Sequence, residues 1–396
     1  MKLNRMAVLL GGVSVQFAIG GVYAWSVFSR ALTSPVAMGI SKVQAAIPFE
    51  TAIAMIFVGA FLGGRLQDRH GPRTVALSGV IVYSIGALTS SFASKPEQLW
   101  ILILGYGVLG GFGLGMAYIV PVALLQKWFP DKAALATGAA VAGFGFGAVI
   151  TAPVAQLLIN RNPAHPTSAF LVLGLGYLVI GTLGASMLVS PASTQSAIKS
   201  DETSFTVKQA LRMPQWYLLT ATLALSVTAG ISLISVAAAS SQDIAGFSIT
   251  SAATAVGLLG LFNGAGRLLW PAIGLRVGKT RALAAILALQ GIALLILPHA
   301  SAPVLFTALA AVIYTCYGGA FGTLPATAGQ YFGLAHSGAI YGLMLIGWSI
   351  GGVVGPLLAT ALLGEGQNYV LAFSVVGGLA ILASALPLLV RQPTDS

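Results

Sequence analysis

Arg267 stands in the middle of an apolar run, in the stretch LFNGAGRLLW at positions 261–270. The nearest charged residues along the chain are Asp243 and Arg276. In a membrane-spanning helix such a charge costs about 2.5–3.5 kcal/mol, and an arginine cannot lose its proton to escape that cost. Its planar fork of N–H donors suits a carboxylate. The stretch therefore predicts that Arg267 faces the interior of a helix bundle and meets an anion there.

Few groups in the chain can be that anion. No acidic residue lies in the middle of another apolar run, and Glu50, the only acid well inside one, falls near its outer end. We favour a mobile anion from solution, because ionisable residues inside membrane segments are functional by default. Pairing with backbone carbonyls or with Glu50 stays the alternative. Asn263, one helical turn before Arg267, either donates to the same anion or forms an interhelical hydrogen bond.

The composition is that of a membrane protein. Of the 396 residues, 57% are hydrophobic and 7% are charged, whereas a soluble domain carries about a quarter charged residues. The apolar runs are long and lack the alternation of a membrane barrel, so we expect transmembrane helices. Cys316 is the single cysteine and the four histidines have no ligand spacing. We therefore expect no disulfide, no metal site and no cofactor, and no clustered His, Asp or Glu that would indicate an enzyme.

Twelve apolar runs are separated by polar breaks, and the longest polar stretch, 190–215, divides them six and six. We expect an N-terminal six-helix half at 1–190, a cytoplasmic linker at 191–214 and a C-terminal six-helix half at 215–396. The prediction is an all-α membrane protein with twelve transmembrane helices, at about 6–28, 44–64, 74–92, 98–125, 133–158, 168–189, 215–239, 250–274, 281–298, 303–325, 336–362 and 369–390.

The two halves repeat weakly. Pro153 and Pro356 lie 203 residues apart, and the segments Arg-His-Gly at 69–71 and Arg-Val-Gly at 276–278 lie 207 apart. Two parallel six-helix halves around a site at the membrane midplane are a transporter architecture. The repeat therefore predicts that Arg267 lies in a central site shared by both halves.

Lysine and arginine are unevenly distributed between the two sides of the predicted bundle, fourteen against four, with Arg267 left over. By the positive-inside rule, both termini are cytoplasmic and the chain is a multi-pass protein of the inner (plasma) membrane. The net charge of +10 is thereby a topology signal beside an anionic lipid leaflet, and we expect no nucleic-acid partner. We expect a monomer. The four outer basic residues are Arg30, Lys42, Lys95 and Arg161.

The stretch GGRLQDRHGPR at 63–73 resembles the loop 2–3 signature of the major facilitator superfamily. The resemblance implies a conformational latch at the cytoplasmic ends of the helices, made by Asp68 with Arg69 and Arg73. The simpler interpretation is that the two arginines only obey the positive-inside rule. At the corresponding place in the second half, Leu275 stands where Asp68 would be, so a weaker latch is expected there.

Within that superfamily the chain resembles the oxalate/formate antiporter family, close to bacterial monocarboxylate transporters. The stretches that carry this resemblance are WFPDK at 128–132, LFNGAGRLLW at 261–270, YGGAFGTLPA at 317–326 and YGLMLIGWSIGG at 341–352. It implies that Arg267 binds the substrate carboxylate. It also implies a central cavity lined by Tyr23, Tyr118, Phe144, Tyr317 and Phe321, where the tyrosine hydroxyls can reach an anion.

One position departs from the oxalate carriers of that family. They place a lysine on span 11, where this chain has Trp348, and Leu345 replaces a second aromatic residue of that helix. One fixed cation suits one carboxylate, and a larger apolar wall suits a short carbon chain. The sequence therefore predicts secondary active transport of small monocarboxylates such as L-lactate or pyruvate.

The coupling is left open between two modes. Proton symport by alternating access is our first expectation, since a co-transported proton removes the energy of moving an uncompensated charge, about 2.3 kcal/mol per 100 mV. Glu50 is the candidate proton site. Anion exchange of the oxalate/formate type is the alternative. A non-transporting membrane sensor for the anion is the alternative of another class, and it should carry a signalling domain.

Glycines recur every four residues in three of the predicted spans. Such spacing lets helices approach closely. We expect either smooth seams between the halves, as rocking motion needs, or close static packing. The glycines are Gly107, Gly111 and Gly115 in span 4, Gly143 and Gly147 in span 5, and Gly347, Gly351 and Gly355 in span 11.

Overall fold

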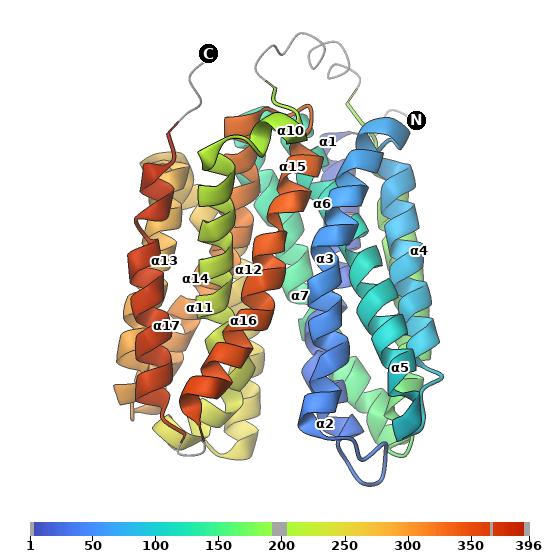
Figure 1. The fold of residues 1–396 in the computed structure, drawn as a ribbon. Helices are drawn as coiled ribbons and strands as arrows, with labels where there is room; N and C mark the ends of the chain where they lie inside the picture. Colours follow the sequence, from blue (N-terminus) through green and yellow to red (C-terminus); the bar gives the residue numbers. More distant parts are fainter. Residues whose placement is uncertain (1–3, 192–203, 365–366, 392–396) are drawn as a thin grey trace.

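The structure is a computed structural model that describes residues 4–191, 204–364 and 367–391. Within these ranges it contains helices and no strand, and twelve segments are long and apolar enough to cross a membrane. The prediction of twelve helical spans is confirmed. The first and last described residues, Asn4 and Arg391, lie at the same end of the bundle (Figure 1), which we call the terminal end. The other end is called the opposite end.

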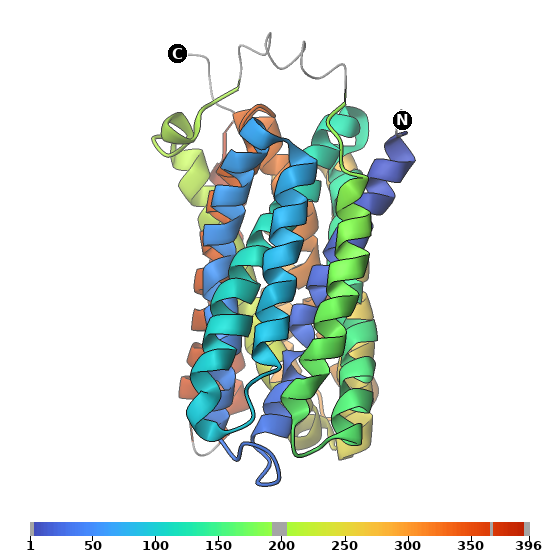
Figure 2. The ribbon, with the colours of Figure 1, turned by 90° about the vertical axis from the view of Figure 1, so that its right-hand side faces the viewer.

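The helices fall into two groups that lie side by side in Figure 1. The first group, which faces the viewer in Figure 2, contains α1 (Arg5–Ile19), η1 (Gly20–Ala24), α2 (Trp25–Leu32), α3 (Lys42–His70), α4 (Pro72–Ser90), η2 (Pro96–Gln98), α5 (Leu99–Leu102), η3 (Ile103–Gly110), α6 (Gly111–Trp128), η4 (Pro130–Lys132), α7 (Ala133–Arg161), η5 (Pro166–Ser168) and α8 (Ala169–Ser186).

The second group contains α11 (Pro214–Ala245), α12 (Ile249–Val277), α13 (Lys279–Ile296), η6 (Leu297–His299), α14 (Pro303–Phe332), α15 (Ser337–Met344), α16 (Ile346–Leu363), α17 (Tyr369–Ala383) and η7 (Leu386–Leu389). Of the predicted linker, 192–203 lie outside the described residues. Its described part holds α10 (Val207–Ala210), and the Phe205 amide donates to the Phe332 carbonyl over 3.0 Å. This part of the linker therefore packs against the terminal end of α14.

The repeat is visible in how the helices end. Gly71 ends α3 with φ 81° and Gly278 ends α12 with φ 96°, and residues other than glycine rarely adopt such positive φ angles. In each case the next helix starts at the following residue, Pro72 or Lys279. The tight turn between the second and third span is thus built in the same way in both halves.

The glycine stripes hold helices together inside each half. A Cβ atom at Gly143 or Gly147 would collide with the backbone of α1, and one at Gly347 or Gly351 would collide with the backbone of α11. The stripe in span 4, including Gly115, meets α3. The interpretation of these stripes as seams between the halves is therefore wrong, and close static packing accounts for them.

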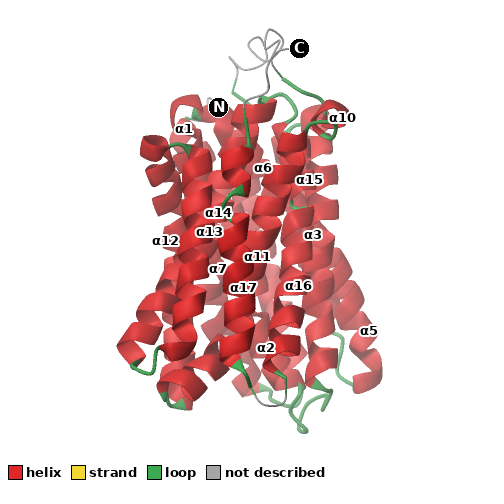
Figure 3. Cartoon of the chain, turned by 60° about the vertical axis from the view of Figure 1, so that its left-hand side comes forward, coloured by secondary structure: helices red, strands yellow, loops and turns green. Residues whose placement is uncertain are grey.

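Other small residues bring the two halves together. A Cβ at Gly64 of α3 would overlap the backbone at Gly338 of α15, and one at Gly342 would lie 2.5 Å from the Ala60 carbonyl oxygen. These contacts lie near the terminal end, while the helices spread apart toward the opposite end in Figure 3. The halves are therefore closed against each other at the terminal end.

Three of the described spans are interrupted inside their length and not merely at an end. Span 1 contains the 3₁₀ segment η1, span 4 contains the π-helical segment η3, and span 11 breaks at Leu345 between α15 and α16. In span 1 the chain passes so close to α7 that a Cβ at Gly20 would overlap the Phe144 carbonyl. Irregular backbone of this kind is typical of helices that line a binding site.

A glycine variant tests the packing within the first half. Gly115→Ala places a methyl group onto the Ile56 carbonyl of α3, and overpacking of this kind costs about 1–3 kcal/mol. We expect a lower melting temperature in detergent, followed by size-exclusion chromatography after heating. Gly176→Ala is the matched control, because a Cβ there meets nothing within 4 Å. Equal melting temperatures for the two variants would contradict the assigned contact.

Candidate functional site

The backbone of Arg267 is wedged between the two halves. Gly322 of α14 and Gly138 of α7 both approach its carbonyl so closely that a Cβ at either glycine would overlap the oxygen. Since α7 belongs to the first half and α14 to the second, α12 is held against both. The side chain at position 267 is thereby placed at the interface between the halves, and it is 1% exposed.

The Arg267 guanidinium makes two hydrogen bonds inside the protein. Its Nε donates to Asn263 Oδ1 over 3.2 Å, and its Nη1 donates to the Val141 carbonyl of α7 over 3.1 Å. Its Nη2 is buried and has no hydrogen-bond partner of regular geometry in the described part of the chain. One edge of the guanidinium is thus held by the protein, and Nη2, which lies close to the Tyr23 hydroxyl without regular hydrogen-bond geometry, can donate to another acceptor.

Aromatic rings cover the guanidinium. Its carbon lies 5.3 Å from the ring centre of Phe144 and 5.2 Å from that of Phe321. Phe144 comes from α7 and Phe321 from α14, so each half supplies one ring. Such cation–π contacts contribute about 0.5–2 kcal/mol each, with the larger values where the site is dry.

The other predicted site residues gather around these rings. Trp348 lies 4.9 Å from Phe321 and 5.6 Å from Tyr118 between ring centres, and Tyr118 lies 5.5 Å from Phe144. The Tyr23 and Tyr317 hydroxyls are 3.2 Å apart and join the two halves. Apart from Tyr23, which is half-buried, these residues are at most 1% exposed. The structure thus brings the predicted aromatic residues and Asn263 together with Arg267.

Leu345 is fully buried in the break between α15 and α16, three residues before Trp348. Glu50 is half-buried on α3, and it forms no ion pair among the described residues. Of the two protein partners considered for Arg267, the structure therefore contains the backbone carbonyl and not the Glu50 carboxylate.

Buried polar atoms without a hydrogen-bond partner cluster near Arg267. Besides Nη2 they are Trp348 Nε1 and the hydroxyls of Tyr118 and Tyr341. The two hydroxyls face each other, and the Trp348 indole faces the Tyr317 hydroxyl, in both cases without regular hydrogen-bond geometry. Together with Nη2, the indole N–H and the hydroxyls form a set of donors that an anion can satisfy.

Two contributors were missed from the sequence. Tyr341 stands in the span 11 stretch that carries the family resemblance, but its side chain was not assigned to the site. Val141 contributes its backbone carbonyl, and nothing in the residue type indicates that role. The contact could be recognised only from the packing of α7 against α12 in the structure.

At the terminal end, Asp68 contacts both halves. Its carboxylate lies 3.9 Å from Lys127 Nζ of α6 and 3.7 Å from His336 Nδ1, which precedes α15. Arg69 and Arg73 are exposed and take part in no ion pair in the described ranges. Asp68 therefore has the contacts that a latch requires. Arg69 and Arg73 lack them, as expected if the two arginines only obey the positive-inside rule.

The comparisons with known proteins agree with this architecture. A sequence profile described as "Major Facilitator Superfamily" matches residues 8–350. An uncharacterized MFS-type transporter of Escherichia coli, YhjX, is 28% identical over 88% of this chain and 86% of its own. The oxalate:formate antiporter of Oxalobacter formigenes is 25% identical over 90% and 85%, and monocarboxylate transporter 13 of Rattus norvegicus is 27% identical over 84% and 77%.

A solved structure shares the fold. The MFS proton:xylose symporter XylE, bound to 6-bromo-6-deoxy-D-glucose, superposes with a TM-score of 0.71 at 14% identity, over 98% of this chain and 96% of that one. At this identity the likeness shows the fold alone.

The Asp68 contacts generate a prediction about conformation. An ion pair of this exposure contributes up to about 1 kcal/mol, so Asp68→Asn should raise the population open at the terminal end by up to about fivefold. Nitroxides at Thr74→Cys and Arg281→Cys, exposed positions on α4 and α13, would report it as longer distances in double electron–electron resonance. The buried Cys316 is replaced by serine in all samples.

The control for this measurement is Asp131→Asn, which neutralises an exposed acid at the same end that contacts no described basic side chain. It should leave the distances unchanged. If Asp68→Asn also leaves them unchanged, the ion pair does not hold the two halves together.

Proposed function

This chain belongs to the major facilitator superfamily, and on that premise we propose that it is a secondary active transporter of small monocarboxylates such as L-lactate or pyruvate. One observation carries the proposal. A buried guanidinium between the two halves keeps its Nη2 without a hydrogen bond of regular geometry, close to the Tyr23 hydroxyl, and has no carboxylate partner among the described residues. A substrate carboxylate satisfies Nη2 and neutralises the charge.

The charge and shape of the site favour one carboxylate over two. Arg267 is the single basic side chain within the aromatic cluster, and Trp348 occupies the side that would have to hold a second cation. The rings of Trp348 and Phe321 offer an apolar wall to a short carbon chain. The names of two relatives, an oxalate:formate antiporter and a monocarboxylate transporter, agree with a small carboxylate as substrate class.

Alternating access follows from where the contacts lie. Arg267, on α12, is bonded across the interface to α7, and the Tyr23–Tyr317 contact crosses it as well. An anion bound there would touch both halves, so its binding would favour the closed arrangement. Opening toward the terminal end then requires separation of α3 from α15, the contact that includes Asp68 and Gly64.

The Val141 contact bears on coupling. Because the Val141 carbonyl and two aromatic faces already compensate much of the Arg267 charge, the halves can close around it with protein groups alone. An obligatory exchanger needs the opposite, a charge that prevents closure without substrate. This contact therefore favours net uptake with a proton, and Glu50 stays our candidate proton site. Exchange is the second candidate, favoured by the similarity to the oxalate:formate antiporter over 90% of this chain.

We place the protein in the inner (plasma) membrane as a monomer with both termini cytoplasmic. The excess of basic residues on the side of the termini supports this orientation. The terminal end of the structure is then the cytoplasmic end, where the two halves meet through α3 and α15.

Uptake into liposomes tests the role of Arg267. Arg267→Ala should lower uptake of labelled L-lactate by at least about 30-fold, because truncating one partner of a buried charge pair costs about 2–5 kcal/mol. Arg276→Ala, an exposed arginine on the same helix, is the matched control and should retain uptake. Full uptake by Arg267→Ala would remove the proposed binding role.

The same liposomes separate the two coupling modes. Symport requires that an inward proton gradient drives accumulation in vesicles without internal substrate. Uptake that ignores the gradient and depends on internal substrate would replace symport by exchange while leaving the substrate class unchanged.

Trp348→Lys tests why this site selects one carboxylate. A second cation beside Arg267 should raise oxalate uptake relative to lactate by about tenfold or more, since a charge-assisted hydrogen bond contributes about 1.5–3 kcal/mol. Trp348→Met is the control, because it removes the ring without adding charge. An equal gain in Trp348→Met would assign selectivity to volume, and no gain in Trp348→Lys would contradict the charge argument.

A further inference from the structure

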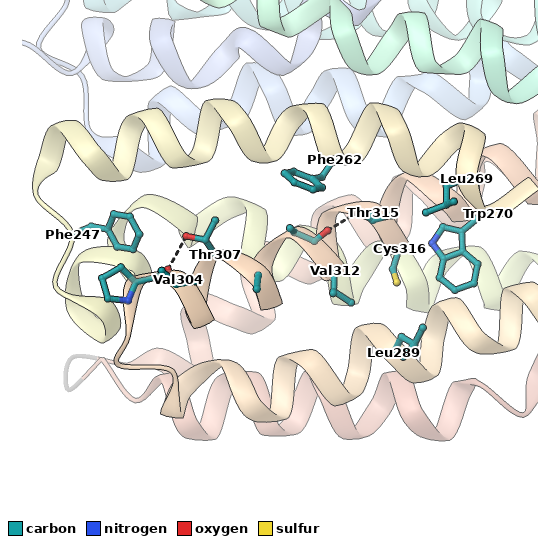
Figure 4. A pocket seen from close by; sticks show the side chains of 13 residues that line it. Phe247, Phe262, Leu269, Trp270, Leu289, Val304, Thr307, Val312, Thr315 and Cys316 are labelled. Atoms are coloured by element: carbon teal, nitrogen blue, oxygen red, sulfur yellow. Dashed lines mark hydrogen bonds between the residues drawn. The ribbon is translucent and has the colours of Figure 1, made fainter. Parts of the chain in front are cut away.

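A groove of about 800 Å³ lies on the second half, away from Arg267 (Figure 4). Its floor is the outer face of α14, from Val304 to Cys316. One wall is α12, with Phe262 and Trp270, and the other is α13, with Leu289. Val304 is 82% exposed, Phe262 45% and Leu289 44%, although all three belong to membrane-spanning helices. The groove therefore faces the hydrocarbon of the membrane.

The lining offers little to water. It contains no charged residue, and both threonine hydroxyls donate within α14, Thr307 to the Pro303 carbonyl over 2.8 Å and Thr315 to the Ala311 carbonyl over 2.7 Å. Figure 4 shows both bonds as dashed lines. The one further side-chain N–H, on the Trp270 indole, is buried and faces the Cys316 thiol. Water needs at least two polar partners to occupy such a space. An apolar occupant is required.

The groove has the length of one leaflet. From Val304 to Cys316 the helix rises by about 18 Å, and half of the hydrocarbon core of a bilayer is about 15 Å thick. It starts where α14 starts, at the opposite end of the bundle, and stops near the middle, where the Trp270 ring stands. A single extended acyl chain entering from the leaflet at the opposite end matches this depth.

The sequence explains why this seam is open in the second half. In the first half, α4 meets η3 through Gly86, where a Cβ would lie 2.5 Å from the Gly105 carbonyl oxygen. In the second half the corresponding helix is α13, and its Gly291 faces α17 instead, 2.6 Å from the Gly377 oxygen. Ala311 and Thr315 of α14 stand 204 residues after Gly107 and Gly111, the separation that also relates Pro121 to Pro325, and those two glycines pack against α3.

We propose that this groove binds one acyl chain of a membrane phospholipid, in extended form, along α14. The chain replaces the helix packing that glycines provide in the first half and supports α12 and α14 from behind. Arg267 and Phe321 lie on these same two helices, so the lipid contacts the back of the site without reaching its polar groups.

The test uses the delipidated full chain in detergent and a phosphatidylcholine with a photoreactive diazirine in the middle of one acyl chain. Labelling should saturate at one lipid per chain, and mass spectrometry should place the adducts on the 304–316 segment of α14. Ala308→Phe fills the groove from an exposed position and should lower labelling by about tenfold, equivalent to about 1.4 kcal/mol. Thr307→Phe, next to it on α14, should act alike.

Val354→Phe is the matched control, because it adds the same ring to a membrane-facing position of α16 that is 44% exposed and outside the groove. It should label as the wild type does. Adducts spread over α8, whose Leu183 is 60% exposed, as heavily as over α14 would overturn the proposal. Labelling by a photoreactive free fatty acid but not by the phospholipid would also overturn it. So would a disulfide between two chains at Val304→Cys that abolishes lipid labelling, because a second copy of the chain would then occupy the groove.

Discussion

The whole arrangement depends on one guanidinium that is enclosed where two halves of the chain meet. At the centre of a bundle its charge is costly, so every neighbour is constrained by it. Asn263 holds it from its own helix, the Val141 carbonyl holds it from the other half, and Phe144 and Phe321 cover it from both sides. The contacts with Val141 and Phe144 therefore stabilise the charge only while the halves are together. In our proposal, an anion bound at Nη2 adds to the same closure and so couples binding to movement.

The sequence was sufficient for the architecture, and it named most of the residues that the structure gathers around Arg267. The length of the apolar runs predicted the twelve spans, because in the hydrocarbon of a membrane the backbone N–H and C=O groups must form their hydrogen bonds within the helix. The single arginine inside an apolar run predicted the position of the candidate site, because a charged side chain in a membrane span has to face the interior of the bundle. Other features depend on tertiary packing. The sequence of one segment does not show which neighbour its glycines meet. It therefore left Gly143 and Gly347 open between seams of the two halves and static packing, and the structure shows that they face α1 and α11.

The two halves share a plan and differ in how they use it. Both turn at a glycine of positive φ after the second span, Gly71 and Gly278. Only the first turn follows an acid that reaches the other half, Asp68, whereas Leu275 at the corresponding place is 50% exposed. The second half carries the arginine and, behind it, the groove along α14. In our account the first half thus supplies the latch and one aromatic cover, and the second half supplies the charge.

The most direct measurement compares binding of L-lactate with binding of L-lactamide, which has nearly the same shape and no charge. Tryptophan fluorescence of the detergent-solubilised protein would report binding, because Trp348 lies within the aromatic cluster around Arg267. If the guanidinium recognises the carboxylate, lactamide should bind at least about 30-fold more weakly, the factor for a loss of about 2 kcal/mol. Equal affinities would contradict the account, since a neutral ligand would then satisfy the site as well as an anion.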